Sequence, residues 1–219
     1  MTQSDKVFRY VRGHILEGSY APGAKLKLND LAQSCDVSLG AVREALSRLS
    51  ADGFVVPESQ KGYKVADIST EELIDLINVR VSIESLCIRA SIERGDIEWE
   101  TGVVAAYHRL SRLSESSDDD PIRVNENWSL AHGEFHFRLA CACQSPILLR
   151  VREQLFTQAE RYRRLSLPLK TTLRDVDGEH KAIMEATLAR KADQACKLMS
   201  RHLNKTSSIL LQSRLFLNR

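Results

Sequence analysis

Apolar residues recur along most of the chain at spacings of three and four, which is the spacing of one face of an α-helix. Glycine and proline interrupt this pattern often before residue 67 and rarely after it. These residues favour turns and end helices, so the two stretches differ in architecture. We therefore expect a boundary near residues 66–68, with one domain at residues 1–67 and a second at residues 68–219.

The first domain is predicted to contain three short helices and a β-hairpin. Helical spacing covers residues 6–17 and 28–34, and Ser38 is a suitable N-cap for a third helix that ends near residue 50. Apolar and β-branched residues at 54–56 and 62–65 flank a polar turn and predict two strands. The order helix, helix, turn, helix, hairpin is that of a winged helix-turn-helix.

The second domain shows helical spacing only. The predicted helices lie at about residues 69–93, 98–114, 122–142, 146–167, 175–189 and 192–215. No strand pattern follows residue 67. The predicted fold class is therefore mainly α, with an N-terminal winged helix-turn-helix and a C-terminal all-α bundle of about six helices.

Composition and charge narrow the possible functions. The 219 residues have a formal net charge of +2, and residues 1–67 contain nine Lys and Arg against eight Asp and Glu. Any binding to DNA would therefore depend on a few well-placed cations and on dimerisation. The chain has no apolar run of the roughly 20 residues that a membrane-spanning helix needs, and its N-terminus lacks the apolar centre of a signal peptide. We expect a cytoplasmic protein.

The five cysteines are scattered and form no C-x-x-C pair. A zinc ribbon or a disulfide framework is therefore not indicated.

The third predicted helix has the features of a DNA recognition helix. Its apolar stripe consists of Val42, Ala45, Leu46 and Leu49. The outward positions are Leu39, Gly40, Arg43, Ser47 and Arg48. In an isolated helix, Arg43 and Glu44 would be interpreted as a solvated face. The complete winged-helix order favours DNA binding instead, because the second helix of this motif enters the major groove.

Four histidines of the second domain are candidate metal ligands. His132 and His136 lie four residues apart, so their side chains share one face of a helix. His180 and His202 fall within the apolar stripes of two later helices. A single histidine in such a place is more often an ordinary core residue, but four inward-facing imidazoles on three helices favour a divalent metal.

Charged residues also fall on core-facing positions. Arg80 and Glu84 lie on the apolar stripe of the first bundle helix, where a charge must be paired or functional. One interpretation is an internal i,i+4 ion pair. A second basic cluster, Arg161, Arg163 and Arg164, is either a solvated face or a source of one arginine for a pocket.

The sequence leaves two further functional classes to consider, a metal-dependent hydrolase and a DNA-binding structural protein. A metal-dependent hydrolase built on the bundle would need a general base, yet Glu134, between His132 and His136, turns away from their face. A DNA-binding structural protein without an effector is disfavoured by the nearly neutral charge.

The chain resembles the GntR family of bacterial transcription regulators, and its second domain resembles the FCD effector domain of the FadR subgroup. The resemblance rests on Val37-Ser38-x-x-Ala41-Val42-Arg43-Glu44-Ala45-Leu46-x-x-Leu49-x-x-Asp52-Gly53 and on Lys61-Gly62-Tyr63-x-Val65. It implies a homodimer that binds a palindromic operator, most simply as a repressor. By position, Ser38 matches the hydroxyl at the helix start, Arg43 the recognition arginine, and Lys61 and Gly62 the wing tip in the minor groove. The sequence departs from the family at Leu39-Gly40-Ala41, where Arg-Thr-Pro is common.

The FCD resemblance implies a metal held by one aspartate and three histidines. His136, His180 and His202 match the three histidines, whereas His132 stands where the family has aspartate. Four neutral imidazoles would leave the full double charge on the ion, which favours zinc or nickel and attracts an anionic effector. The same replacement is also compatible with a weak or empty site.

The resemblance also implies an effector. Arg80 matches the family's arginine that binds an effector carboxylate beside the metal. Residues 80–84 and 94–100 are similar to a family member that represses genes for glutarate and 4-aminobutyrate, which implies a short dicarboxylate. Binding would change the spacing of the two DNA-binding domains in the dimer.

Overall fold

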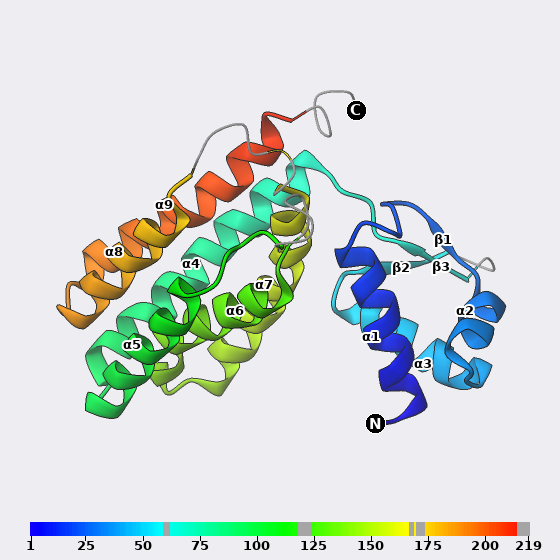
Figure 1. Ribbon diagram of the computed structural model, residues 1–219, viewed down its shortest axis with the longest axis horizontal. Coiled ribbons are helices and arrows are strands. Elements are labelled where there is room, and N and C mark those ends of the chain that lie inside the picture. The colour runs from blue at the N-terminus through cyan, green and yellow to red at the C-terminus, as the bar shows by residue number, and fades with distance from the viewer. Residues whose placement is uncertain (59–61, 118–123, 167–168, 170–173, 214–219) are drawn as a thin grey trace. The chain divides into compact units, whose positions relative to one another are not determined.

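The computed structural model describes residues 1–58, 62–117, 124–166, 169 and 174–213 (Figure 1). The chain divides into two compact units, Met1–Ser69 and Thr70–Arg219. This division lies two residues after the predicted boundary at residue 67.

Unit 1 is a winged helix-turn-helix. Its elements are α1 (Gln3–Leu16), β1 (Lys25–Leu26), α2 (Leu28–Cys35), α3 (Leu39–Ala51), β2 (Val55–Glu58) and β3 (Gly62–Val65). The strands form one antiparallel sheet in the order β1-β3-β2, with Val55 opposite Val65 and Lys25 opposite Lys64. The core forms where α1 and α3 pack together, and the predicted stripe of α3, from Val42 to Leu49, is fully buried.

Two features of unit 1 were not predicted. β1 has only two residues, which is too short for an alternating pattern to appear. α1 begins three residues early because Thr2 and Asp5 form a capping box. The Asp5 amide donates to Thr2 Oγ1 at 3.0 Å, and the Thr2 amide donates to the Asp5 carboxylate at 3.2 Å.

Unit 2 is a helical bundle, as predicted. Its α-helices are α4 (Thr70–Arg94), α5 (Ile97–Ser111), α6 (Glu126–Ala140), α7 (Pro146–Ser166), α8 (Val176–Leu188) and α9 (Ala192–Leu211). The long helix α4 contacts α6, α7, α8 and α9. Within the described part of this unit no strand forms, although Ser116 and Val124 make one isolated β-bridge. None of the described helices is both long and apolar enough to cross a bilayer.

The prediction that α6 begins near residue 122 is wrong for the residues that the structure describes. Val124 and Asn125 are not helical, and Asn125 is the N-cap instead. Its side-chain oxygen accepts hydrogen bonds from the amides of Asn127 and Trp128 at 3.0 and 3.3 Å. Residues 122 and 123 lie outside the described residues. At its other end α6 gives way to a 3₁₀ turn, Cys141–Cys143.

Candidate functional site

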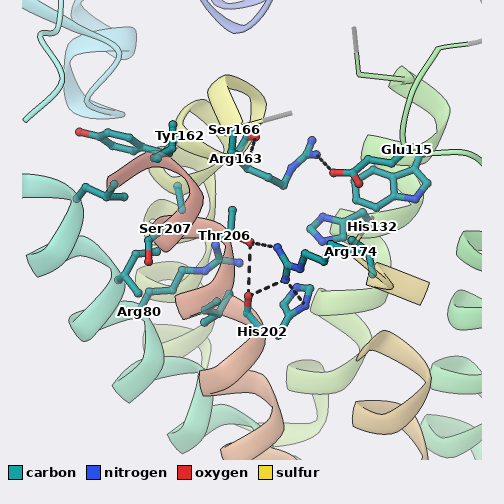
Figure 2. A pocket seen from close by; sticks show the side chains of 17 residues that line it. Arg80, Glu115, His132, Tyr162, Arg163, Ser166, Arg174, His202, Thr206 and Ser207 are labelled. Atoms are coloured by element: carbon teal, nitrogen blue, oxygen red, sulfur yellow. Dashed lines mark hydrogen bonds and ion pairs between the residues drawn. The ribbon is translucent and has the colours of Figure 1, made fainter. Parts of the chain in front are cut away.

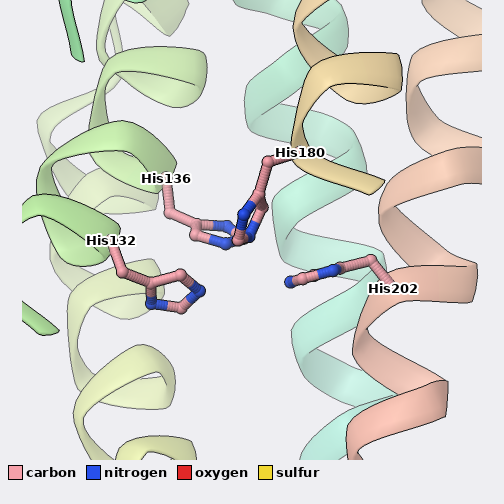
Figure 3. Close-up of side chains that lie close together, drawn as sticks. All are labelled: His132, His136, His180 and His202. Carbon is pink, nitrogen blue, oxygen red and sulfur yellow. The ribbon is translucent and has the colours of Figure 1, made fainter. Parts of the chain in front are cut away.

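The four predicted histidines converge in the interior of unit 2 (Figure 3). His132 and His136 extend from α6, His180 from α8 and His202 from α9. One ring nitrogen from each lies within 4.8 Å of the others, and all four side chains are buried. The ring centroids of His132 and His136 are 4.4 Å apart, and those of His180 and His202 are 4.6 Å apart.

The state of these imidazoles suits a divalent metal. Burial is the main cause that lowers the pKa of each of the four rings below its ordinary value, so each ring is neutral at pH 7 and has a lone pair to offer. Both ring nitrogens of His136, Nδ1 of His132 and Nε2 of His180 are buried without a hydrogen-bond partner. Unsatisfied buried nitrogens are costly, and four in one cluster fit a site for an ion.

His202 has a carboxylate neighbour that the sequence did not predict. Its Nδ1 lies 2.8 Å from Glu179 Oε2, and Arg174 donates to both oxygens of the same carboxylate. Glu179 lies directly before His180 on α8, but no local pattern placed it against a residue of α9.

Arg80 is buried and incompletely paired. Its Nε lies 3.6 Å from Glu84 Oε1, so the predicted i,i+4 ion pair is present without a hydrogen bond. Arg152 donates to the other oxygen of Glu84 at 3.1 Å. Nε and Nη2 of Arg80 have no hydrogen-bond partner, and its guanidinium lies over the Phe156 ring, 5.0 Å from the centroid. Arg80 therefore has free donors for an anion.

Arg80, His132, Arg174 and His202 line one cavity, together with apolar side chains such as Leu73 (Figure 2). Its volume is about 30 Å³, which is room for one or two water molecules.

The second basic cluster is not a solvated face. Arg163 and Arg161 are buried, and Arg163 lines the cavity. Arg163 donates to Glu160 Oε2 at 2.8 Å and to Ser129 Oγ at 2.9 Å, and it forms an ion pair with Glu115. Its donors are therefore largely occupied by these partners.

The predicted DNA-contacting residues at the start of α3 are exposed. Ser38 is the N-cap, and its Oγ accepts from the amide of Ala41 at 3.2 Å. Leu39, Gly40 and Arg43 follow on the solvent-accessible side of the helix. A helix end with exposed side chains and backbone is what entry into a major groove requires.

The other predicted DNA-contacting residues, Arg48, Lys61 and Gly62, differ in their surroundings. Arg48 forms an ion pair with Asp5 at 2.8 Å and lies over the Phe8 ring. Gly62 has a φ of +96°, and a Cβ there would meet Leu28 Cδ1 at 3.3 Å, so the fold itself requires glycine at this place. Lys61 lies outside the described residues.

The sequence matches two families that together span most of the chain. Residues 3–65 match the bacterial regulatory proteins of the gntR family, and residues 75–205 match the FCD domain. The chain belongs to the GntR family of transcription regulators. GntR-family proteins with an FCD domain bind DNA and are regulators and not enzymes, so the alternative of a metal-dependent hydrolase is wrong.

Named relatives agree with this assignment. This GntR-family chain is 38% identical over 208 residues to the uncharacterized HTH-type transcriptional regulator BphR of Paraburkholderia xenovorans (strain LB400), covering 95% of this chain and 85% of the relative. It is 36% identical over 210 residues to the HTH-type transcriptional repressor GlaR of Escherichia coli (strain K12), covering 94% of each.

Solved structures confirm the predicted fold. E. coli McbR/YncC superposes with a TM-score of 0.78 at 18% identity and covers 97% of this chain and 98% of its own. A GntR regulator from Rhodococcus sp. RHA1 superposes with a TM-score of 0.75 at 22% identity and covers 98% of this chain and 100% of its own.

Proposed function

We propose that the protein is a ligand-responsive repressor that binds a palindromic operator as a homodimer. In this proposal a small carboxylate is the effector, and it binds in unit 2 at a divalent metal held by His132, His136, His180 and His202. The protein would act in the cytoplasm, where bacterial operators are.

Effector binding is proposed because several buried polar groups inside unit 2 lack hydrogen-bond partners. Three of the four clustered imidazoles, those of His132, His136 and His180, have ring nitrogens without partners, and the Arg80 guanidinium has free donors. A bound zinc or nickel ion would supply a positive centre there, and Arg80 would donate to the effector carboxylate. Arg80 shares its carboxylate partner, Glu84, with Arg152, so an anion would complete the pairing of Arg80.

The size of the cavity sets a condition on this binding. The cavity has room for only one or two water molecules, so we expect lining side chains to move when the effector enters. A short dicarboxylate is the proposed effector because residues 80–84 and 94–100 are similar to a family member that represses genes for glutarate and 4-aminobutyrate. Repression is proposed because the relative GlaR is named a repressor.

The DNA-binding half rests on the exposed start of α3. We propose that α3 enters the major groove with Arg43 at a base edge and that the wing, including Lys61 and Gly62, contacts the minor groove. Leu39 is exposed and would contact an apolar edge such as a thymine methyl. Ser38 and Gly40 would lie near the sugar-phosphate backbone of the DNA. Arg48 would contact a phosphate if the DNA replaces Asp5 as its ion-pair partner.

The metal site is tested on protein purified without an affinity tag. Elemental analysis is expected to find one zinc or nickel per chain. A thermal-shift screen of short mono- and dicarboxylates is then run with and without chelator. We expect stabilisation by one class of acid that disappears when the chelator is present, because ligands that bind only the folded state stabilise it by mass action. Protein without a stoichiometric divalent ion would contradict the ligand assignment.

A further inference from the structure

The proposed metal site has a second layer of contacts around His202. We propose that Glu179 is a positioning residue, whose carboxylate holds His202 in the tautomer that offers Nε2 to an ion. This inference rests on the proposed function, because it concerns the same four-histidine cluster.

The geometry defines the tautomer. Nδ1 of His202 lies 2.8 Å from Glu179 Oε2, a hydrogen-bond distance at which Nδ1 must carry the proton because the carboxylate can only accept. Arg174 Nη2 also lies 3.3 Å from this nitrogen, but it has better acceptors in Glu179 Oε2 at 2.6 Å and the His202 carbonyl at 2.9 Å. The lone pair of His202 is therefore on Nε2, and the ring extends toward the other three histidines (Figure 3).

Glu179 is itself held rigidly. Arg174 donates to both of its oxygens, with Nε 3.1 Å from Oε1, and Lys205 Nζ lies 2.8 Å from the same Oε1. Arg174 also donates to Thr206 Oγ1 at 2.9 Å (Figure 2). The Glu179 carboxylate of α8 is therefore tied to two successive turns of α9, at His202 and Thr206. A fixed carboxylate fixes the direction of the imidazole that donates to it.

The absence of a carboxylate among the four proposed ligands gives this contact more weight. Four neutral imidazoles cancel none of the ion's charge, whereas a carboxylate hydrogen-bonded to one of them makes that ring a more basic ligand. Among the described residues, Glu179 is the carboxylate seen to bond one of the four rings.

The test compares zinc affinity in variants of the full-length protein, measured by competition with a chromogenic chelator. Glu179→Ala is expected to weaken zinc binding by about 10–100-fold, the usual effect of removing such a partner. Glu179→Gln keeps an acceptor for Nδ1–H without the charge, so it should weaken binding less. Glu185→Gln is the matched control, because Glu185 is an exposed carboxylate on the same helix.

A second measurement separates orientation from helix packing. Nitrogen-15 NMR of the metal-free protein should show His202 protonated on Nδ1, and Glu179→Ala should convert this signal to a mixture of tautomers. Arg174→Gln removes the link from α8 to Thr206 but leaves Glu179 against His202. It should lower the melting temperature of the metal-free protein and weaken zinc binding less than Glu179→Ala does, because Lys205 still holds the carboxylate.

Results that differ from these expectations would refute either the positioning role of Glu179 or the metal site itself. Wild-type zinc affinity in Glu179→Ala, an unchanged tautomer in that variant, or an equal loss of affinity in Arg174→Gln would refute the positioning role alone. Wild-type protein that binds no zinc or nickel would refute the metal site, and this inference with it.

Discussion

Gly40 lies in the first turn of α3, in a place where the fold does not require glycine. Its φ is not positive, and a Cβ built on it would have Ser38 Oγ as its nearest neighbour, at 3.8 Å. Glycine in a helix costs up to about 1 kcal/mol relative to alanine. A glycine at an exposed helix start without a structural reason is consistent with close approach of the backbone to DNA.

Gly40→Ala is therefore expected to leave the melting temperature unchanged or slightly higher and to weaken operator binding. Gly13→Ala in α1 is the matched control, because a Cβ there meets nothing within 4 Å and lies outside the recognition helix. Thermal unfolding and fluorescence anisotropy with operator DNA measure the two quantities. Unchanged operator affinity in Gly40→Ala would remove Gly40 from the interface.

The second prediction for α3 concerns the side chain of Arg43. Arg43→Ala should weaken operator binding by about 1–3 kcal/mol if the guanidinium contacts a base, with no loss of folding because Arg43 is exposed. Arg109→Ala, an exposed arginine of α5, controls for the loss of one positive charge. Equal affinities of Arg43→Ala and wild-type protein for the operator would count against this contact.

At the scale of elements, buried charges connect α6 and α7. Glu160 of α7 accepts from Ser129 of α6 at 2.8 Å and forms ion pairs with Arg163 and Arg164. Burial alone would raise the pKa of Glu160, but the two guanidinium groups and the hydroxyl together lower it to about 2. The network therefore stabilises unit 2 only while Glu160 is ionised.

The pH dependence follows from the sign of this shift. A carboxyl group with a pKa lowered from 4.5 to about 2 contributes stability that is complete above pH 4.5 and is lost as the pH falls toward 2. Its size is about 3 kcal/mol, since each pKa unit corresponds to about 1.4 kcal/mol. Glu160→Gln should therefore lower the free energy of unfolding at pH 7, and the difference from wild type should shrink below pH 4.5.

Urea unfolding at several pH values checks this expectation. Glu134→Gln is the control, because Glu134 pairs with Arg138 on the exposed side of α6 and such pairs contribute little. A difference between wild type and Glu160→Gln that stays constant from pH 7 to pH 3 would show that ionisation of Glu160 is not the cause.

The elements also show what the sequence can predict. Long helices such as α4 and α9 were predicted because each buries one stripe over many turns, which the 3.6-residue period reveals. β1 and the start of α6 were missed because they depend on backbone partners and on a single cap. Likewise, His132 and His136 share a helix face that spacing reveals. Glu179 meets His202 only because α8 packs on α9, and that contact is not encoded in either local pattern.

At the scale of the whole molecule, the low net charge of unit 1 means that the proposed operator must gain affinity from its two half-sites. Nine basic and eight acidic residues before residue 68 give little non-specific attraction, so the affinity of the proposed dimer would depend on binding two half-sites at once. Insertion of about 5 base pairs between the half-sites turns one of them to the opposite side of the duplex, since a turn takes about 10.5 base pairs. We expect gel-shift binding to fall to half-site affinity. An insertion without effect would contradict binding as a dimer.

The proposed function requires that effector binding in unit 2 changes operator binding by unit 1. Thermodynamic linkage makes this coupling measurable from either ligand. If the effector weakens operator affinity by some factor, operator DNA must weaken effector affinity by the same factor. His136→Ala removes one proposed ligand in unit 2 and none of the exposed residues of α3. It should bind the operator as tightly as wild type and fail to release it when the carboxylate is added. Arg43→Ala should show the reverse: weak operator binding with an intact effector-dependent thermal shift. Anisotropy titrations with the effector check both, and a normal dose–response in His136→Ala would mean that release is controlled from somewhere other than the histidine cluster.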